Sequence, residues 1–144
     1  MKAIVREKYG SPDVLQLKDV EKPTPKDDEV LVKIHTASVN EDDLEYLRGT
    51  FIVRMGGPLK PKDKILGTDI AGKVEAVGKN VIQYQIGDEI LTDLSMHGFG
   101  AFAEYKCVPE KALMLKPASM TFEEAVTLPS RAIIAVQSLR NKRQ

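Results

Sequence analysis

Apolar and polar residues alternate along several short stretches of the chain, as they do in half-buried β-strands. The alternation is clear over residues 30–35 and again over residues 70–76, where Lys73 and Glu75 would face water. Similar short stretches predict further strands at Lys2–Arg6, Leu15–Val20, Glu89–Asp93, Ala101–Val108 and Ala112–Leu115. Because turn residues separate these strands, the sequence predicts a mainly β fold, a barrel or sandwich rather than alternating βαβ units.

Helical signals are few and local. Asn40 can cap a short helix whose first turn is acidic and which ends at Gly49. Thr121 and Glu124 have the spacing of a capping box, which predicts a second short helix that stops near Pro129. The segment Phe51–Lys64 contains two adjacent glycines and two prolines and is predicted to be a long loop.

The last helical segment, from Arg131 onward, is unusually apolar for the surface of a small domain. Its apolar residues spread over a broad face and are Ala132, Ile133, Ile134, Val136 and Leu139. We therefore expect this face to contact a partner, and a homodimer formed through this helix is one arrangement that would bury it.

Composition and charge narrow the classes of function. The 144 residues include 21 Lys plus Arg and 21 Asp plus Glu, so the formal net charge is zero and no field attracts nucleic acid or anionic lipid. The length suits one domain, and no apolar run is long enough to cross a bilayer. Cys107 is the only cysteine, and charge appears too early for a signal peptide. These features predict a cytoplasmic domain that binds neither nucleic acid nor membrane.

The residue types offer little for a metal ion. A zinc site needs three or four converging ligands, and the candidates are scattered: His35 in a strand, His97 beside a glycine turn and Cys107. The run Gly67–Val74 approaches a phosphate-binding loop, but Val74 replaces the hydroxyl residue and strand-like alternation follows it. The residues themselves thus predict neither a metal site nor a nucleotide site.

Several motifs, taken in order, resemble the medium-chain dehydrogenase/reductase superfamily; they are Val30–Asp43, Ile65–Gly78, Gly98–Tyr105 and Phe122–Pro129. The resemblance is closest to its zinc-independent, quinone-oxidoreductase-like branch, whose members reduce quinones, enones or related carbonyls with NADPH. It implies that residues 1–129 form a GroES-like catalytic domain, a partly open β-barrel with a few short helices. It also implies that residues 130–144 begin a helix leading to a Rossmann cofactor domain, which these residues do not include.

The resemblance assigns residues to the reaction centre. Zinc-dependent relatives have Cys at the position of Asn40 and His at that of Thr68, so this chain is expected to be zinc-independent. Asn40 would lie near the nicotinamide and the substrate carbonyl, where its amide could donate a hydrogen bond to the oxygen as hydride arrives. Thr68 and Thr127 would join Asn40 in contacting the cofactor. Tyr46 would line the pocket or offer a proton.

The substrate pocket is implied at Asp43, which would orient the loop, and at the apolar residues Phe51, Ile52 and Met55. Two further positions depart from the family pattern, since Arg131 stands where a small residue is usual and Ile134 where Thr is common. The resemblance implies the catalytic half of an oxidoreductase, expected to be inactive and to bind no NADPH tightly on its own. The alternative is a non-catalytic GroES-like module for assembly or partner binding.

Overall fold

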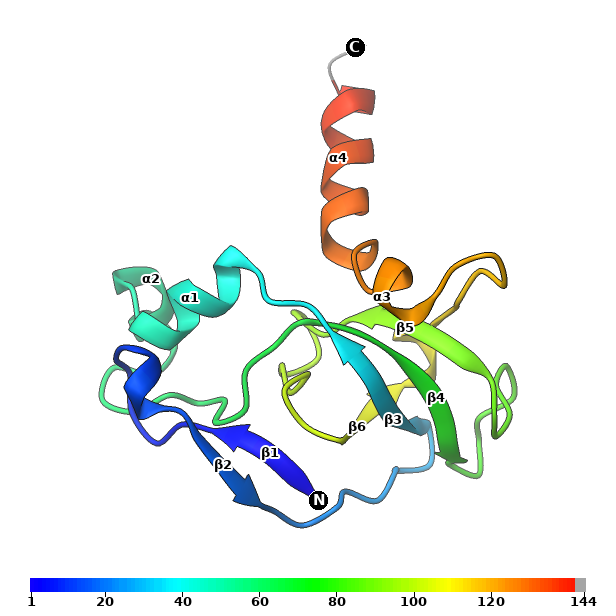
Figure 1. Ribbon diagram of the computed structural model, residues 1–144, viewed down its shortest axis with the longest axis horizontal. Coiled ribbons are helices and arrows are strands. Elements are labelled where there is room, and N and C mark those ends of the chain that lie inside the picture. Colours follow the sequence, from blue (N-terminus) through cyan, green and yellow to red (C-terminus); the bar gives the residue numbers. More distant parts are fainter. Residues whose placement is uncertain (142–144) are drawn as a thin grey trace.

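The computed structural model describes residues 1–141, which fold mainly into antiparallel β-sheet (Figure 1). Strands β1 (Lys2–Val5) and β2 (Gln16–Asp19) form a separate two-stranded sheet. The remaining five strands form one sheet in the order β6-β3-β4-β5-β7; they are β3 (Glu29–Ala37), β4 (Asp69–Val77), β5 (Glu89–Asp93), β6 (Tyr105–Pro109) and β7 (Met114–Leu115). Both sheets are open, so the predicted mainly β, partly open barrel is confirmed.

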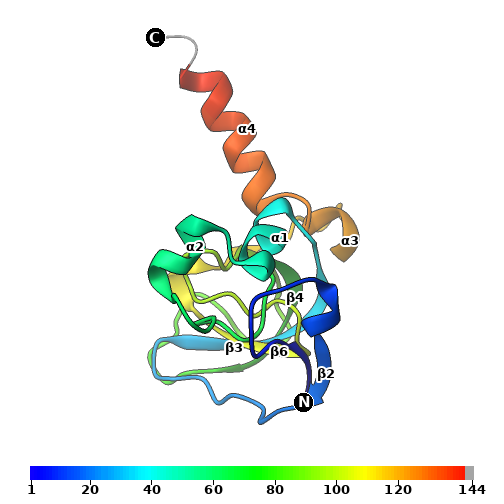
Figure 2. The ribbon, with the colours of Figure 1, turned by 90° about the vertical axis from the view of Figure 1, so that its left-hand side faces the viewer.

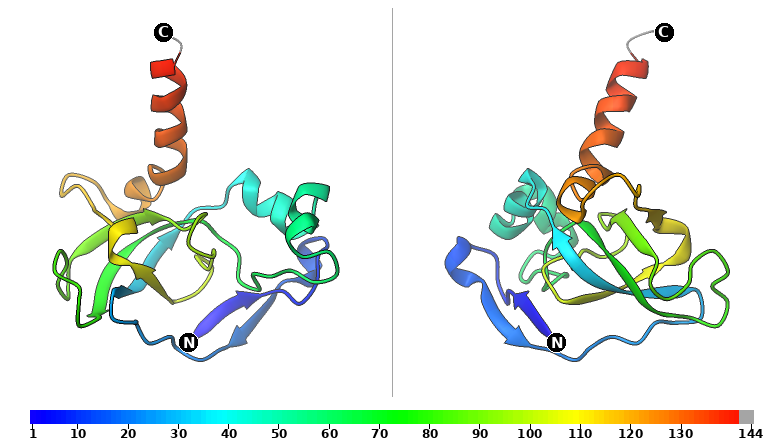
Figure 3. Two further views of the ribbon diagram at one scale, coloured as in Figure 1. Left: turned by 180° about the vertical axis from the view of Figure 1, so that it is seen from behind. Right: turned by 45° about the vertical axis from the view of Figure 1, so that its right-hand side comes forward.

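The larger of two clusters of buried apolar side chains packs against the five-stranded sheet, whose curvature Figure 3 shows. The two longest strands, β3 and β4, pair antiparallel along most of their length and contribute four of the cluster's nine buried side chains. Its central side chains are almost fully buried and are Val30, Val32, Ile70, Val74, Ile90 and Val108. Burying such aliphatic side chains is the main favourable term in folding, so this core holds the ends of β3 and β4 in place.

The short helices begin where the capping signals predict, although the second of them ends at Ala125 rather than near Pro129. Helix α1 (Glu41–Arg48) has Asn40 at its N-cap position and ends at Gly49, whose φ of 67° lies in the left-handed region. Helix α3 (Phe122–Ala125) opens with reciprocal bonds, because the Thr121 hydroxyl accepts from the Glu124 N–H and the Glu124 carboxylate accepts from the Thr121 N–H. Two 3₁₀ turns cover Pro12–Val14 and Glu110–Ala112.

Two sequence predictions were wrong in detail. The predicted loop Phe51–Lys64 starts with a helix, α2 (Phe51–Gly56), because Thr50 stands at the N-cap position and the stretch from Phe51 to Gly57 contains no proline. The strand predicted at Ala101–Val108 begins only at Tyr105, since the chain there first crosses to β1 and makes a single bridge between Ala3 and Ala103. Neither difference changes the layout of the barrel.

Helix α4 (Pro129–Asn141) projects away from the sheets (Figures 1 and 2). Its side chains Ile133, Ile134, Val136 and Leu139 are all exposed. The predicted connecting helix 130–144 coincides with α4 as far as residue 141, and residues 142–144 lie outside the described part of the chain. The division into domains at residue 129 stays a prediction. Among the described residues, none of the helices has the length and apolar character to cross a membrane.

Candidate functional site

A buried carboxylate lies where β4 begins and α4 leaves the barrel. Asp69 is 1% exposed, and its two oxygens accept three hydrogen bonds. Oδ2 accepts from Ser38 Oγ at 3.2 Å and from Asn40 Nδ2 at 2.7 Å, and Oδ1 accepts from Ser130 Oγ at 2.6 Å. The loop between β3 and α1, the start of β4 and the first turn of α4 are thus joined at one side chain. Three donors offset the cost of burying a charge that has no cation within ion-pair distance in residues 1–141.

The Asn40 amide lies beside this carboxylate and connects it to α4. Its Nδ2 lies 3.0 Å from Ser38 Oγ and 3.4 Å from Thr68 Oγ1, besides its bond to Asp69. Its Oδ1 accepts from Arg131 Nε at 3.2 Å. The donor side of the amide therefore faces the interior, whereas the oxygen faces α4. This differs from the expectation that the amide donates outward to a substrate oxygen.

Asp43 fixes the start of α1 against the residues that lead into β4. Its carboxylate accepts from the Asn40 backbone N–H at 2.8 Å and from the Gly67 N–H at 3.1 Å. Burial raises the pKa of the Asp43 carboxyl above its usual value, and the two backbone donors oppose that shift. Because one of these donors belongs to Asn40 and the other, Gly67, directly precedes Thr68, Asp43 holds Asn40 and Thr68 in place relative to each other.

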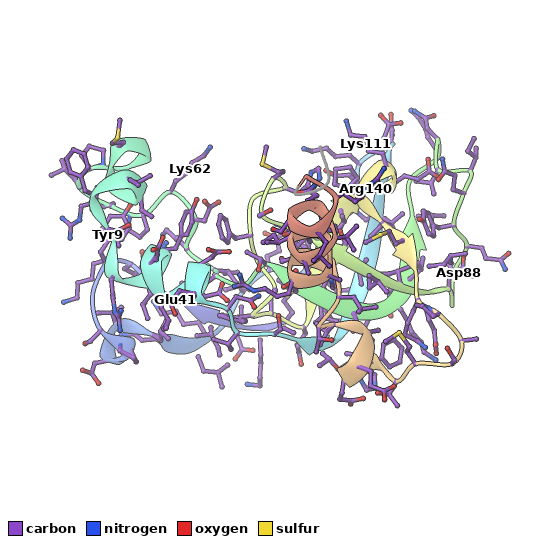
Figure 4. The ribbon with its side chains drawn as sticks, turned by 90° about the horizontal axis from the view of Figure 1, so that it is seen from above. Tyr9, Glu41, Lys62, Asp88, Lys111 and Arg140 are labelled. Atoms are coloured by element: carbon purple, nitrogen blue, oxygen red, sulfur yellow. The ribbon has the colours of Figure 1, made fainter. Side chains whose placement is uncertain are left out.

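A cavity of about 400 Å³ lies between α1, α2 and the Phe99 loop. The Tyr46 ring packs against Phe99 with the ring centroids 4.4 Å apart. Arg6, which is buried, also lines the cavity and donates to the backbone oxygens of Tyr46 and Asp63. The remaining lining includes Tyr9, Glu45, Ile52, Val53 and Lys62. Figure 4 shows Tyr9 and Lys62 on the α2 side of the molecule, away from α4. The cavity therefore has aromatic walls with charge at its edge.

The structure brings some of the predicted site residues together and separates others. Asn40 and Thr68 belong to the Asp69 cluster, whereas Tyr46 and Ile52 line the cavity. Phe51 and Met55 are 82% and 76% exposed and do not line it. The Thr127 hydroxyl, between α3 and α4, donates to the Glu124 carbonyl oxygen at 2.7 Å.

Sequence reasoning missed Asp69 and Ser130 altogether and noted Arg131 only as an unusual residue. Their approach depends on where α4 docks, and residues 69 and 130 are 61 positions apart. One local signal existed: an acidic residue directly before the apolar run that starts at Ile70 has to be paired if it is buried.

Cys107 lies at a different cavity, of about 430 Å³, which Lys64 and Lys106 also line. Burial raises the pKa of the Cys107 thiol to about 11, and the nearby Glu29 carboxylate adds to the shift. Cys107 is thus a protonated thiol near neutral pH rather than a nucleophile.

Within residues 1–141 there is no group of three or more His, Cys, Asp or Glu side chains able to hold a metal ion.

The raised pKa gives a direct test of the Cys107 environment. A thiol with a raised pKa keeps its proton at pH 8, so alkylation by iodoacetamide should be roughly tenfold or more slower in the folded chain than in the chain unfolded by urea. The rate should continue to rise with pH up to about 11. Equal rates at pH 8 in the folded and unfolded chain would contradict the assignment.

The open antiparallel sheets and short helices agree with a GroES-like domain. The chain belongs to the family of the alcohol dehydrogenase GroES-like domain, which matches residues 26–118.

Relatives in this family carry oxidoreductase names. The chain is 38% identical to 2-methylene-furan-3-one reductase of Solanum lycopersicum, over 96% of this chain and 37% of the relative. It is also 38% identical to the chloroplastic NADPH-dependent alkenal/one oxidoreductase of Arabidopsis thaliana, over 90% of this chain and 34% of the relative. The solved quinone oxidoreductase from Coxiella burnetii superposes with a TM-score of 0.88 at 30% identity, over 98% of this chain and 44% of that protein. The chain thus spans well under half the length of these relatives.

Proposed function

We propose that residues 1–129 form the substrate-side catalytic domain of an NAD(P)H-dependent oxidoreductase that reduces quinones, enones or related carbonyls. In this proposal α4 begins the connection to a Rossmann cofactor domain. The observation that carries it is the polar cluster of Ser38, Asn40, Thr68 and Asp69, fastened to the base of α4 through Ser130. The cluster thereby fixes polar groups at the point where the connecting helix leaves the barrel. The names of the relatives support the same reaction class.

The residues of this cluster fit a nicotinamide cofactor. Asn40 Oδ1 faces α4 as an acceptor, which suits a carboxamide N–H or a ribose hydroxyl. Thr68 supports Asn40 from its buried position, and the exposed Thr127 hydroxyl would add a polar contact at the same end of the barrel. When bound, NADPH would supply the hydride. Zinc-dependent relatives have two zinc ligands at the positions that Asn40 and Thr68 hold in this chain, so the proposed reaction requires no zinc.

The cavity beside α1 and α2 would take the ring system of the organic substrate, with the reacting carbonyl group directed along α1 toward its N-cap residue, Asn40. Tyr46 and Phe99 offer flat aromatic surfaces against which a quinone or enone can stack, and the Tyr46 hydroxyl would supply a proton. Ile52 provides an apolar wall, and the exposed Phe51 and Met55 on α2 would extend it around a larger substrate.

A second candidate is a non-catalytic module that assembles through α4. The observation in its favour is the exposure of four large apolar side chains on that helix, which a homodimer or another partner would cover. A catalytic domain explains the same exposure, since α4 would then pack against the cofactor domain. Reductase activity therefore decides between the two.

The experiment joins this chain through α4 to the cofactor domain of a related quinone oxidoreductase and follows NADPH absorbance in the presence of naphthoquinone. We expect the fusion to oxidise NADPH, and the 144-residue chain alone to do so negligibly. Asn40→Ala should lower kcat roughly tenfold, because the Oδ1 acceptor that would position the nicotinamide is lost, whereas Asn80→Ala, at an exposed asparagine bonded to Asp28, should leave kcat unchanged. A folded fusion that binds NADPH but reduces neither a quinone nor an enone would favour the non-catalytic module.

A further inference from the structure

The orientation of the Asn40 amide decides which atom can meet a substrate. Its two amide hydrogens face three acceptors, Ser38 Oγ, Thr68 Oγ1 and Asp69 Oδ2. An ionised carboxylate only accepts, so the reversed amide would place two acceptor oxygens 2.7 Å apart. Asn40 is therefore held with its oxygen outward and has no donor left for a substrate oxygen.

Arg131 supplies the missing donor at the same place. Its Nε–H donates to Asn40 Oδ1 at 3.2 Å, and the neighbouring Ser130 anchors the first turn of α4 to Asp69. Among residues 1–141, this is the one hydrogen bond that the Arg131 side chain makes, and its guanidinium has no carboxylate within ion-pair distance. A guanidinium has five N–H donors in a planar fork, so four remain on its two terminal nitrogens. The side chain is exposed and carries its positive charge beside the Asn40 oxygen.

We propose that Arg131 is a catalytic residue that binds the carbonyl oxygen of the substrate and stabilises the negative charge formed there, an inference that rests on the proposed function. When hydride is added to an enone or quinone, the π electron pair moves onto that oxygen, the substrate is reduced and the nicotinamide is oxidised. The resulting enolate or hydroquinone anion then takes a proton from Tyr46 or solvent. A guanidinium at this position favours this charge and needs no metal ion.

The charges around Arg131 favour a singly charged oxygen over a phosphate group. Asn40 bridges Arg131 and the buried Asp69 carboxylate, so the positive charge of Arg131 is already partly balanced. A phosphate with two negative charges would be repelled by Asp69, and no lysine belongs to the cluster. A single negative charge that develops only during reduction fits this balance better.

The binding test uses the 144-residue chain and para-nitrophenolate, an aromatic oxyanion that mimics a hydroquinone anion. Wild-type chain is expected to bind it, with the largest NMR shift at the Arg131 Nε–H. Arg131→Gln should weaken binding about tenfold, and Arg131→Lys should retain part of it. Arg140→Gln removes an exposed arginine from the other end of the same helix (Figure 4) and is the matched control. Equal binding by wild type and Arg131→Gln, or tighter binding of inorganic phosphate than of the phenolate at Arg131, would overturn the proposal.

The fusion enzyme separates this inference from the proposed function. Arg131→Gln should lower kcat for quinone reduction about a hundredfold while the KM for NADPH stays unchanged. If Arg131→Gln reduces quinones as fast as the unmodified fusion, the catalytic role is wrong and the proposed function stands. If a folded, NADPH-binding fusion has no reductase activity, the proposed function and the catalytic role both fail, even where the phenolate binds.

Discussion

Replacing Asp69 with alanine should lower the free energy of unfolding by about 3 kcal/mol, roughly one for each hydrogen-bond donor left without its partner. The three donors are Ser38 Oγ, Asn40 Nδ2 and Ser130 Oγ, which come from three separate segments. Removing a buried charge returns part of this energy, but water cannot readily replace a carboxylate that is 1% exposed. Urea unfolding followed by circular dichroism measures the difference.

Two further variants test whether the lost stability comes from the hydrogen bonds of Asp69. Asp69→Asn keeps the size of the side chain; its oxygen can accept from Ser38 and Asn40 while its NH₂ donates to Ser130, so most of the stability should return. Asp93→Ala removes the residue paired with Asp69 across β4 and β5, which is only half-buried and accepts one bond from the Ser95 N–H. Its cost should stay within about 1 kcal/mol. If Asp93→Ala were as costly as Asp69→Ala, the loss would reflect strand position rather than the cluster.

Much of the fold could be predicted from the sequence, because alternation and capping residues mark strands and helices locally. Alternation over residues 30–35 and 70–76 marks the two central strands, and capping residues at Asn40 and Thr121 mark the starts of α1 and α3. The start of β6 was misplaced because the residues before Tyr105 have strand-like composition but pair with β1 at only one point. Local pattern indicates that a segment is extended, whereas the pairing partner is set by the whole sheet.

The candidate site could be predicted only in part, because its contacts join residues that are far apart in the sequence. Asn40 and Thr68 could be chosen by resemblance, but the direction of the Asn40 amide depends on Asp69 and on a helix 91 residues away. The relative positions of the helices and strands determine such a hydrogen-bond network, and the network leaves no periodic pattern in the sequence. The same limit applies to Phe51 and Met55, which share a short helix with Ile52 yet face solvent outside the cavity.

Replacing Gly67 with alanine should also lower the free energy of unfolding by about 3 kcal/mol, from backbone strain and from overpacking. Gly67 has a φ of 96°, a conformation that side chains rarely adopt. A Cβ atom there would lie 2.5 Å from the Ala101 Cβ and 2.8 Å from the Phe102 ring, so neighbouring loops must move. The Gly67 N–H also donates to Asp43, and a shift would disturb the start of α1. Urea unfolding again provides the measurement.

Gly87→Ala separates the two causes, because Gly87 has nearly the same φ, 97°, and nothing within 4 Å of the added methyl group. It should cost about 1 kcal/mol from backbone strain alone, so the remainder at Gly67 measures the packing against Ala101 and Phe102. In the fusion enzyme, Gly67→Ala should lower kcat as well, because Gly67 holds Asp43 and Asp43 holds the Asn40 backbone. Gly87→Ala should leave kcat unchanged. Equal costs at both glycines would show that the loop around Gly67 yields freely, and the cluster would then lack the rigid support on which the proposed role of Asn40 depends.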